Sequence, residues 1–443
     1  MRPLLRPVLL VAGATALAVV ITFGAAALLG GSHDTRPQAL PSAAGRSTPG
    51  VDPAAVADPN DAIASLQARL RRTPKDHRSW STLSLSYVEQ ARITADPTYY
   101  PKAQAALAKA AALAPHDSVM LTARATLETA RHEFTAALRS ADEALTINPY
   151  SGAAEAIRTD ALTELGRYPA AQKAAGRADD LDPGPSTFAR LSYQAELLGD
   201  LAEATRLMRL AQKESGTSAS SYAFATFHLG ELARAGGDLR LAAHHYRNAL
   251  DADPTYMPAL AGQARLAVAA GDVAGAVKDY TRVVQRLPLT EYVVELGELY
   301  QATGRQRLAD QQYAVATASA RLLAANGVAT DLETAVFQAD HGSPAAALDA
   351  ARAEWARRHS IHTADALAWA LHATGDDKAA LRYARQANQL GTRDARIVFH
   401  LGAIEAGNRL AAASTTLREA QTLDSGVSPF RDQQISTLLA GLR

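Results

Sequence analysis

Glycine recurs along this chain at nearly constant intervals, and that spacing constrains the fold more than any other feature. Eight glycines are separated by 33, 38, 34, 33, 38, 33 and 32 residues, and alanine stands five positions after each one. The glycines are Gly166, Gly199, Gly237, Gly271, Gly304, Gly342, Gly375 and Gly407, and the alanines are Ala171, Ala204, Ala242, Ala276, Ala309, Ala347, Ala380 and Ala412. Two markers with one period indicate a repeated structural unit.

Prolines follow the same period and suggest what the unit is. Pro115, Pro149 and Pro183 are 34 residues apart, as are Pro254 and Pro288. Glycine permits the left-handed conformation that ends a helix, an Asp or Asn directly after it can cap the next helix, and proline stops that helix. Each unit is therefore predicted to be two helices joined by a tight turn. The predicted caps are Asp200, Asp238, Asp272, Asp376 and Asn408.

The repeated positions resemble the tetratricopeptide repeat (TPR), whose 34 residues carry W-x2-L-G-x2-Y, then A-x3-F, then P. Trp80, Leu83, Ser84 and Tyr87 match the first half, and Ala242 with Tyr246, Ala276 with Tyr280 and Ala309 with Tyr313 match the second. The resemblance implies an all-α fold, a right-handed α-solenoid of TPR helix pairs over residues 60–443. We expect ten pairs from His77 to about Ser425, with a single helix near 61–72 and another near 429–442 at the ends.

The N-terminal region predicts a membrane segment. Residues 8–29 carry no charge, and these 22 residues would span about 33 Å as a helix, enough for a bilayer. Arg2 and Arg6 precede them, which favours a cytoplasmic N-terminus with the rest of the chain outside the membrane. We therefore expect a signal-anchor or transmembrane helix over 1–30. The A-x-A pattern of Ala25 and Ala27 leaves a cleaved signal and a secreted protein open.

The next segment, residues 31–59, is rich in Pro, Gly, Ala and Ser and poor in large apolar residues. Such a composition cannot bury enough surface to offset its chain entropy, so we predict a disordered linker. One insertion interrupts the repeat pattern further on, at residues 94–101 (TADPTYYP). We expect this insertion to be a packed loop, with a ligand-contacting loop as the alternative.

The resemblance implies that the first helix of each pair lines the inner, concave surface. The residue after the small packing residue is rotated about 100° from the packing seam and should face that groove, together with residues one turn away. This places ten candidate binding residues there: Asp160, Tyr193, Glu196, Phe227, Glu231, Arg234, Arg265, Glu298, Asp365 and Trp369. Their aromatic and charged side chains suit a peptide or protein partner, although an ordinary solvated face is equally compatible. A small molecule or glycan bound near Tyr193, Phe227 and Trp369 is the alternative.

Other function classes find little support in the sequence. The 45 basic and 45 acidic residues balance, so no nucleic-acid partner is expected. There is no cysteine, which excludes thiolate metal sites and cysteine nucleophiles. His362 and His372 share a helix face but lie about 15 Å apart along its axis, too far for one ion. No hydrolase, nucleotide or zinc-protease motif occurs. We therefore expect no catalytic residue, metal or cofactor, and predict a membrane-tethered interaction scaffold.

Overall fold

The structure is a computed structural model that describes residues 59–442. Over this range the chain forms 22 α-helices and no strand. The helices are α2 (Pro59–Arg72), α3 (His77–Thr94), α4 (Tyr99–Leu113), α5 (Ser118–Ala130), α6 (Phe134–Ile147), α7 (Gly152–Glu164), α8 (Tyr168–Leu181), α9 (Pro185–Leu197), α10 (Leu201–Lys213), α11 (Ala219–Ala235), α12 (Leu239–Ala252), α13 (Met257–Ala269), α14 (Val273–Arg286), α15 (Thr290–Ala302), α16 (Gln306–Ala325), α17 (Asp331–His341), α18 (Pro344–Trp355), α19 (Ile361–Ala373), α20 (Asp377–Ala387), α21 (Ala395–Gly407), α22 (Ala413–Asp424) and α23 (Pro429–Gly441). None of these helices is long and apolar enough to cross a bilayer. The predicted anchor and linker lie outside the described residues.

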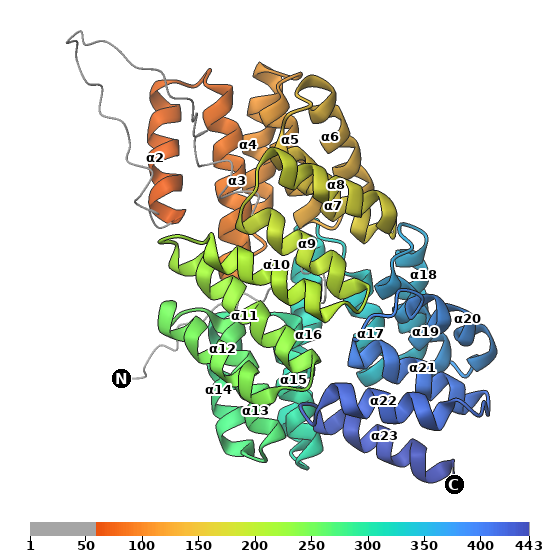
Figure 1. Cartoon of the computed structure of the whole chain (residues 1–443). Helices are drawn as coiled ribbons and strands as arrows, with labels where there is room; N and C mark the ends of the chain where they lie inside the picture. The colour runs from red at the N-terminus through yellow and green to blue at the C-terminus, as the bar shows by residue number, and fades with distance from the viewer. Residues whose placement is uncertain (1–58, 443) are drawn as a thin grey trace, which may run out of the picture.

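Consecutive helices pack in antiparallel pairs, which is the architecture of a TPR array (Figure 1). The ten pairs run from α3–α4 to α21–α22, with α2 before them and α23 after them. This confirms the predicted ten pairs and the two single end helices, because α3 begins at His77 and α22 ends at Asp424. The right-handed sense of the superhelix stays a prediction.

The turns inside the pairs have the predicted chemistry. Gly237 and Gly271 have φ angles of 84° and 79°, a conformation that glycine adopts without a Cβ clash. The side chains of Asp238 and Asp272, directly after them, accept backbone N–H groups of α12 and α14. The predicted caps Asp200 and Asp376 do the same for α10 and α20. These caps fix where each second helix begins.

Small residues let the two helices of a pair approach closely. The seven alanines from Ala171 to Ala380 in the series above are all 0% exposed. In the α11–α12 pair, a Cβ atom at Gly230 of the first helix would lie 2.5 Å from the Tyr246 ring of the second. That ring is itself 0% exposed. The repeated small residues are therefore a packing requirement, since a close-packed interior has no room for added atoms.

The last pair departs from the predicted register. Gly407 is the last residue of α21 and does not lie in the turn after the helix, where the other glycines of the series lie. Arg409 takes the left-handed conformation of that turn, with a φ angle of 57°. Asn408 was expected to cap the next helix, but it is the C-cap of α21, and its amide donates to the carbonyl of Asp377 at 2.7 Å. With that amide engaged, α22 begins later and Ala413 takes the buried position predicted for Ala412.

The insertion at residues 94–101 is packed. Ala95 adopts the left-handed conformation and ends α3, and Tyr99 begins α4. The neighbouring Tyr100 packs against Leu323 and Val328, far along the chain, and burial raises its pKa to about 12. The insertion is therefore packed, as expected, and Tyr100 brings early and late repeats into contact. The alternative of a ligand-contacting loop stays untested.

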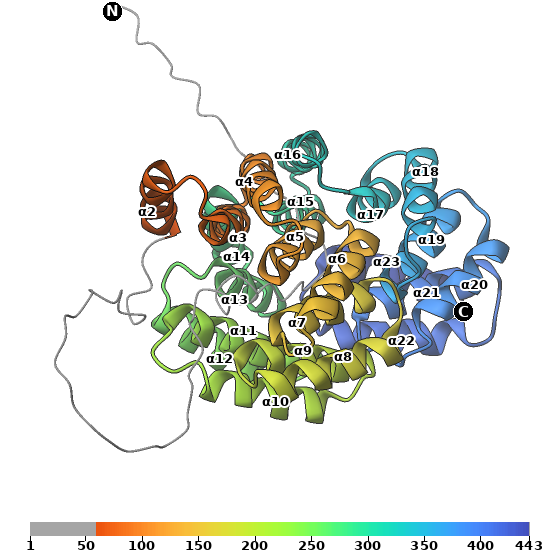
Figure 2. The same cartoon turned by 90° about the horizontal axis from the view of Figure 1, so that it is seen from above.

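Three early turns contact three late turns, so the chain closes on itself (Figure 2). We call this contact the closure seam; it joins the turns within the α5–α6, α7–α8 and α9–α10 pairs to the α16/α17, α18/α19 and α20/α21 turns. The Ala329 backbone N–H donates to the Arg131 carbonyl at 3.1 Å. The Ile361 backbone N–H donates to the Tyr168 hydroxyl at 2.7 Å. In a simple repeat array each repeat touches only its neighbours, and the sequence did not predict this closure.

Buried ions hold the middle of the closure seam. Arg358, whose side chain is 3% exposed, pairs with Glu354 of its own segment and with Glu164 at the end of α7. Its guanidinium also lies 4.7 Å from the centre of the Phe134 ring. These ion pairs explain why the Glu354 carboxylate can be buried on α18.

Candidate functional site: a central cavity

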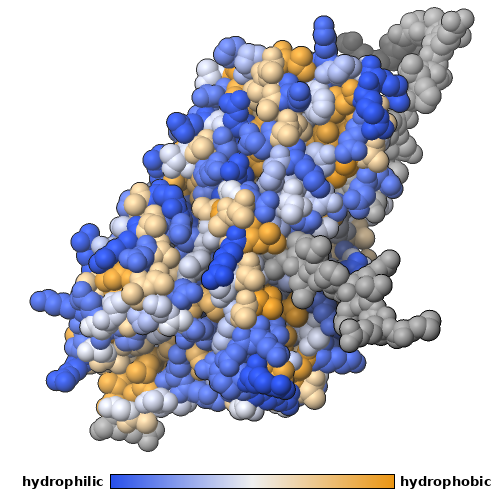
Figure 3. Space-filling view, turned by 180° about the vertical axis from the view of Figure 1, so that it is seen from behind, coloured by the Kyte–Doolittle hydropathy of each residue, from blue (hydrophilic) through white to orange (hydrophobic). Residues whose placement is uncertain are grey.

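A cavity of about 620 Å³ lies inside the closed superhelix. Its wall comes from early, middle and late helices, from Val88 on α3 to Gln434 on α23. Most lining residues belong to the first helices of the pairs, including α9, α11, α13, α15, α17 and α21. The cavity is therefore the predicted concave surface, enclosed by the closure seam. On the outside, the face in Figure 3 mixes polar residues with small separate groups of apolar ones.

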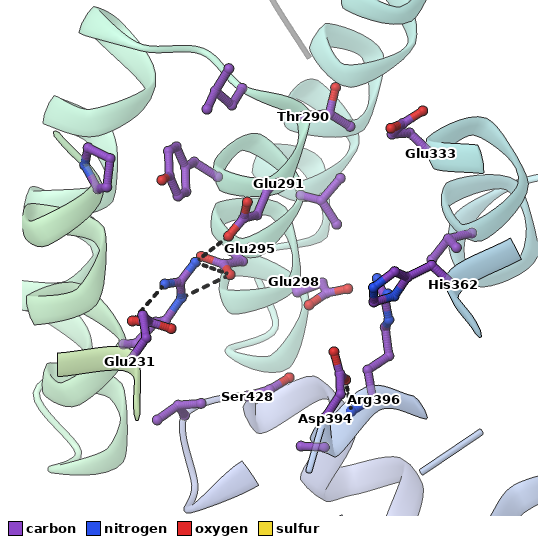
Figure 4. Close-up of a pocket in the computed structure, with 18 of the residues that line it drawn as sticks. Glu231, Thr290, Glu291, Glu295, Glu298, Glu333, His362, Asp394, Arg396 and Ser428 are labelled. Atoms are coloured by element: carbon purple, nitrogen blue, oxygen red, sulfur yellow. Dashed lines mark hydrogen bonds and ion pairs between the residues drawn. The ribbon is translucent and has the colours of Figure 1, made fainter. Parts of the chain in front are cut away.

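Carboxylates from two helices meet around one arginine in the cavity wall (Figure 4). Glu291 and Glu295 lie four residues apart on one face of α15. The Arg265 guanidinium of α13 reaches Glu291 at 2.6 Å, Glu295 at 2.8 Å and Glu231 of α11 at 3.6 Å. Arg265 is only 7% exposed, so this ionic group is largely removed from water. One guanidinium here serves three carboxylates.

The carboxyls of this group are not equally stabilised. Burial opposes ionisation of Glu231, but Arg234 at 2.9 Å, Arg265 and the Tyr246 hydroxyl outweigh it and lower the pKa to about 2. Burial raises the pKa of Glu291 to about 7, because Arg265 is shared and the neighbouring Glu295 adds repulsion. Near neutral pH Glu291 is therefore only partly ionised, whereas Glu231 is fully ionised.

Glu196, on α9, has no ion-pair or hydrogen-bond partner among the described residues. Burial raises its pKa to about 7, and the nearby carboxylates Glu231 and Asp394 contribute to the rise. On α15, one turn beyond Glu295, Glu298 meets His341 at 3.0 Å, and burial raises its pKa as well. The Glu196 carboxyl group therefore remains available to a ligand, whereas Glu298 already contacts His341.

Two buried polar side chains complete this part of the wall (Figure 4). The Thr290 hydroxyl has no hydrogen-bond partner within the described residues, and the residue is 7% exposed. His362 is 8% exposed; its Nε2 lies 3.2 Å from the Tyr193 hydroxyl, and its Nδ1 has no partner in the described part of the chain. Burial lowers the pKa of His362 to about 4, so the ring is neutral near neutral pH.

Seven of the ten predicted binding residues line this cavity: Tyr193, Glu196, Phe227, Glu231, Arg234, Arg265 and Glu298. Asp160 lies in a separate small recess, where both of its carboxylate oxygens accept from Arg190 at 2.8 Å. Whether any of the ten binds a ligand stays a prediction. Their common position shows that the first helices do present this face inward.

Asp365 and Trp369 do not face the cavity, so the predicted placement of these two is wrong. Asp365 is 1% exposed and contacts the His400 Nδ1 at 2.8 Å. Trp369 is 6% exposed, stacks on the His400 ring at 4.1 Å and donates from Nε1 to Asp340 at 2.8 Å. The reason is that α21 packs against this face of α19 and covers it.

The sequence analysis missed several residues of the wall, among them Glu291, Glu295, Asp394 and Arg396. A signal for the first two was present, because Glu291, Glu295 and Glu298 follow one another at i, i+4 and i+7 on one helix face. Asp394 and Arg396 stand at the start of α21, and only the closure of the chain brings them to the cavity. Within residues 59–442, no group of three or more metal-binding side chains is arranged to hold an ion.

Comparison with known proteins yields structural likenesses only. No family model matches, and no curated protein matches. PilW, a type IV pilus biogenesis factor, is 20% identical over 44% of this chain and 90% of its own, with a TM-score of 0.38. The Cut9–Hcn1 hetero-tetramer of APC/C is 15% identical over 87% of this chain and 90% of its own, with a TM-score of 0.38. The human IFIT1 dimer with m7Gppp-AAAA is 14% identical over 74% of this chain and 76% of its own, with a TM-score of 0.48. Identities this low and TM-scores below 0.5 leave the function open.

Proposed function

We propose that this chain is a binding protein that holds a short segment of a partner polypeptide in the central cavity. The observation that carries the proposal is the composition of the cavity wall, which combines aromatic rings with charged groups from helices far apart in sequence. The aromatic lining residues are Tyr100, Tyr193, Phe224, Phe227, Tyr256, Tyr280, Tyr292, Phe337, Phe399 and Phe430. Rigid aromatic side chains beside a few fixed charges are typical of protein-recognition surfaces.

The volume of the cavity limits what can enter. Cavities of about 300–1,000 Å³ hold ligands of small-molecule size, and the 620 Å³ here lies within that range. A chain terminus or a tight loop of a partner therefore fits better than a long helix. The same volume favours a small molecule or glycan as the second candidate, with Tyr193 and Phe227 in the wall and Trp369 outside it.

Site-specific photo-crosslinking tests the proposal. A photoreactive residue would replace Val336, which lines the cavity, and in a second protein Leu241, which is 38% exposed on α12. We expect a polypeptide to crosslink at position 336 and not at 241 in an extract of the native host. Crosslinks at 241 alone would place recognition on the outer surface and refute the proposal, and the absence of any polypeptide crosslink at 336 would favour the small-molecule candidate.

We also propose that the binding domain is tethered outside the cytoplasmic membrane. This proposal rests on the uncharged run over residues 8–29 and on Arg2 and Arg6 before it. Alkaline phosphatase fused after residue 60 should be active in a bacterial host, because the enzyme needs an oxidising compartment. An inactive fusion, together with an active cytoplasmic reporter at the same point, would refute the tether.

A further inference from the structure

We infer that the ligand of the central cavity is cationic and presents lysine or arginine side chains to its wall. The inference rests on the proposed function and adds the chemistry of the segment that is bound. It follows from the charge balance of the wall, from the way in which its arginines are already engaged, and from buried polar groups that have no partner.

The wall carries a surplus of acidic groups. Its carboxyl groups are those of Glu196, Glu231, Glu291, Glu295, Glu298, Glu333, Asp340, Asp394 and Asp424, and its arginines are Arg92, Arg234, Arg265, Arg393, Arg396 and Arg431. Nine carboxyls against six guanidinium groups leave three more acids than bases, and no lysine is among the described lining residues. Five histidines also line the cavity. Burial lowers the pKa values of His228 and His362 to about 4 and lowers that of His132 as well, so these rings are neutral near neutral pH. The other two, His341 and His400, are already engaged by Glu298 and Asp365.

Most of these arginines are already paired. Arg234 binds Glu231, Arg431 binds Asp424, and Arg92 binds Glu89 outside the wall. Arg265 is divided among three carboxylates. A buried or half-buried anion is costly unless a positive partner or hydrogen bonds compensate it. The fold therefore leaves carboxyl groups in the cavity whose ionised form a cationic ligand would stabilise.

Unpartnered polar atoms show where such a ligand would bind. The Thr290 hydroxyl, the His362 Nδ1 and one carboxylate oxygen of Glu295 are buried without hydrogen-bond partners among residues 59–442. The Arg396 Nε also lacks a hydrogen bond, but it lies 3.8 Å from the buried carboxylate of Asp365, which balances its charge. The first three of these residues line the cavity, and Figure 4 shows them around the same space as Glu298 and Asp394. Buried polar groups normally have partners, so these orphaned atoms point to a ligand that supplies them. Aromatic faces beside them favour a cation further.

A binding assay on the purified full-length chain tests the inference. The probes are short fluorescent peptides with blocked ends that carry lysine, glutamine or glutamate at the same positions, together with spermidine as a free polyamine. The variant is Glu196→Gln with Glu298→Gln, which removes two carboxylates and keeps their shape. Glu143→Gln is the matched control, because Glu143 lies exposed on α6 and away from the cavity.

We expect the lysine peptide to bind, the glutamate peptide not to bind, and the cavity variant to bind the lysine peptide about tenfold more weakly, which is about 1.4 kcal/mol. The control variant should match the wild type. Binding of the glutamine or glutamate peptide with equal affinity would overturn the cationic inference and keep the peptide-binding proposal. Binding of spermidine alone would support a cationic site and refute a peptide ligand. If no probe binds, both proposals fail.

Discussion

The closure seam and the cavity wall both bury charged residues, but they satisfy them differently. In the closure seam, Arg358 lies between two carboxylates, Glu164 and Glu354, and all three side chains are at most 5% exposed. In the cavity wall, Arg265 is shared by three carboxylates and Glu196 has no partner among the described residues. The charged groups of the seam therefore find their partners within the chain, whereas the carboxyl groups of the wall lack enough cationic partners in the described residues.

The largest effect is expected from breaking the ionic group of the closure seam. Arg358→Met should destabilise the protein by about 3 kcal/mol or more, because it leaves Glu164 buried without a cation and leaves Glu354 with Arg357 as its only ion-pair partner. The urea midpoint of unfolding, followed by circular dichroism, measures the loss. Since the seam closes the cavity, peptide binding should weaken in the same variant.

A surface ion pair provides the control for this prediction. Arg206, whose side chain is 58% exposed, pairs with Glu203 within one helix, and exposed pairs contribute at most about 1 kcal/mol. Arg206→Met should therefore leave the midpoint almost unchanged. Equal, small effects of Arg358→Met and Arg206→Met would show that the buried ions do not hold the superhelix closed.

The second prediction concerns binding at different pH values. Glu196 is faced by Glu231 and Arg234 of α11 and by Asp394 of the α20/α21 turn, and its pKa is about 7. A cationic ligand prefers the ionised carboxylate, so affinity should fall about tenfold as the pH is lowered from about 7.5 to about 5.5. Fluorescence titration of the lysine peptide across this range measures the change. In Glu196→Gln the dependence should be smaller, and an unchanged dependence would assign it to other groups.

A third and smaller effect is expected on stability. The pKa of Glu196 is higher in the folded protein than its ordinary value of about 4.5. Above about pH 4.5 the carboxyl group ionises more readily in the unfolded chain, so the free energy of unfolding falls as the pH rises. Because the side chain is only partly buried, Glu196→Gln should gain about 1 kcal/mol at about pH 8. At about pH 4 the two proteins should have the same urea midpoint. Destabilisation at both pH values would show that Glu196 has a structural partner.

The sequence predicted the local structure well and the long-range structure poorly, for a physical reason. Helix pairs, their caps at Asp238 and Asp272 and the buried alanines depend on residues within one unit, so a repeated pattern reveals them. Closure depends on small rotations that accumulate over many repeats, and no single position records it. Arg358 illustrates this, because its pairing with Glu164 in the closure seam becomes apparent only when late and early repeats are brought together.

The positions of the candidate site residues were likewise predicted where a local rule applies and missed where long-range packing decides. Tyr193, Glu231 and Arg265 were found because one face of each first helix points inward, and this is a local rule. Asp365 and Trp369 obeyed the same rule in sequence, but His400 of α21 packs over them. Asp394 and Arg396 lie near a helix start that no repeat rule selects, and they reach the cavity only because late repeats return to early ones.

The smallest expected effect is on the pH dependence of stability, which should have opposite signs for His132 in the closure seam and Glu196 in the cavity wall. His132 lies in the closure seam, where its Nδ1 meets the Ala329 carbonyl at 2.8 Å, and burial together with Arg358 lowers its pKa. A histidine with a depressed pKa binds its proton more readily in the unfolded chain, so stability is lost as the pH falls below about 6.5. Glu196 has the opposite slope, because it opposes folding as the pH rises.

The variant His132→Asn isolates this contribution. His132 has a φ angle of 60°, a conformation that Asn tolerates well, so the substitution adds little backbone strain. Between about pH 7 and about pH 5 the variant should lose less stability than the wild type, by up to about 1 kcal/mol in the urea midpoint. The control is His116→Asn on an exposed turn, which should follow the wild type. If the two variants behave alike, acid sensitivity does not arise at the seam, and the separation of the two regions by pH fails.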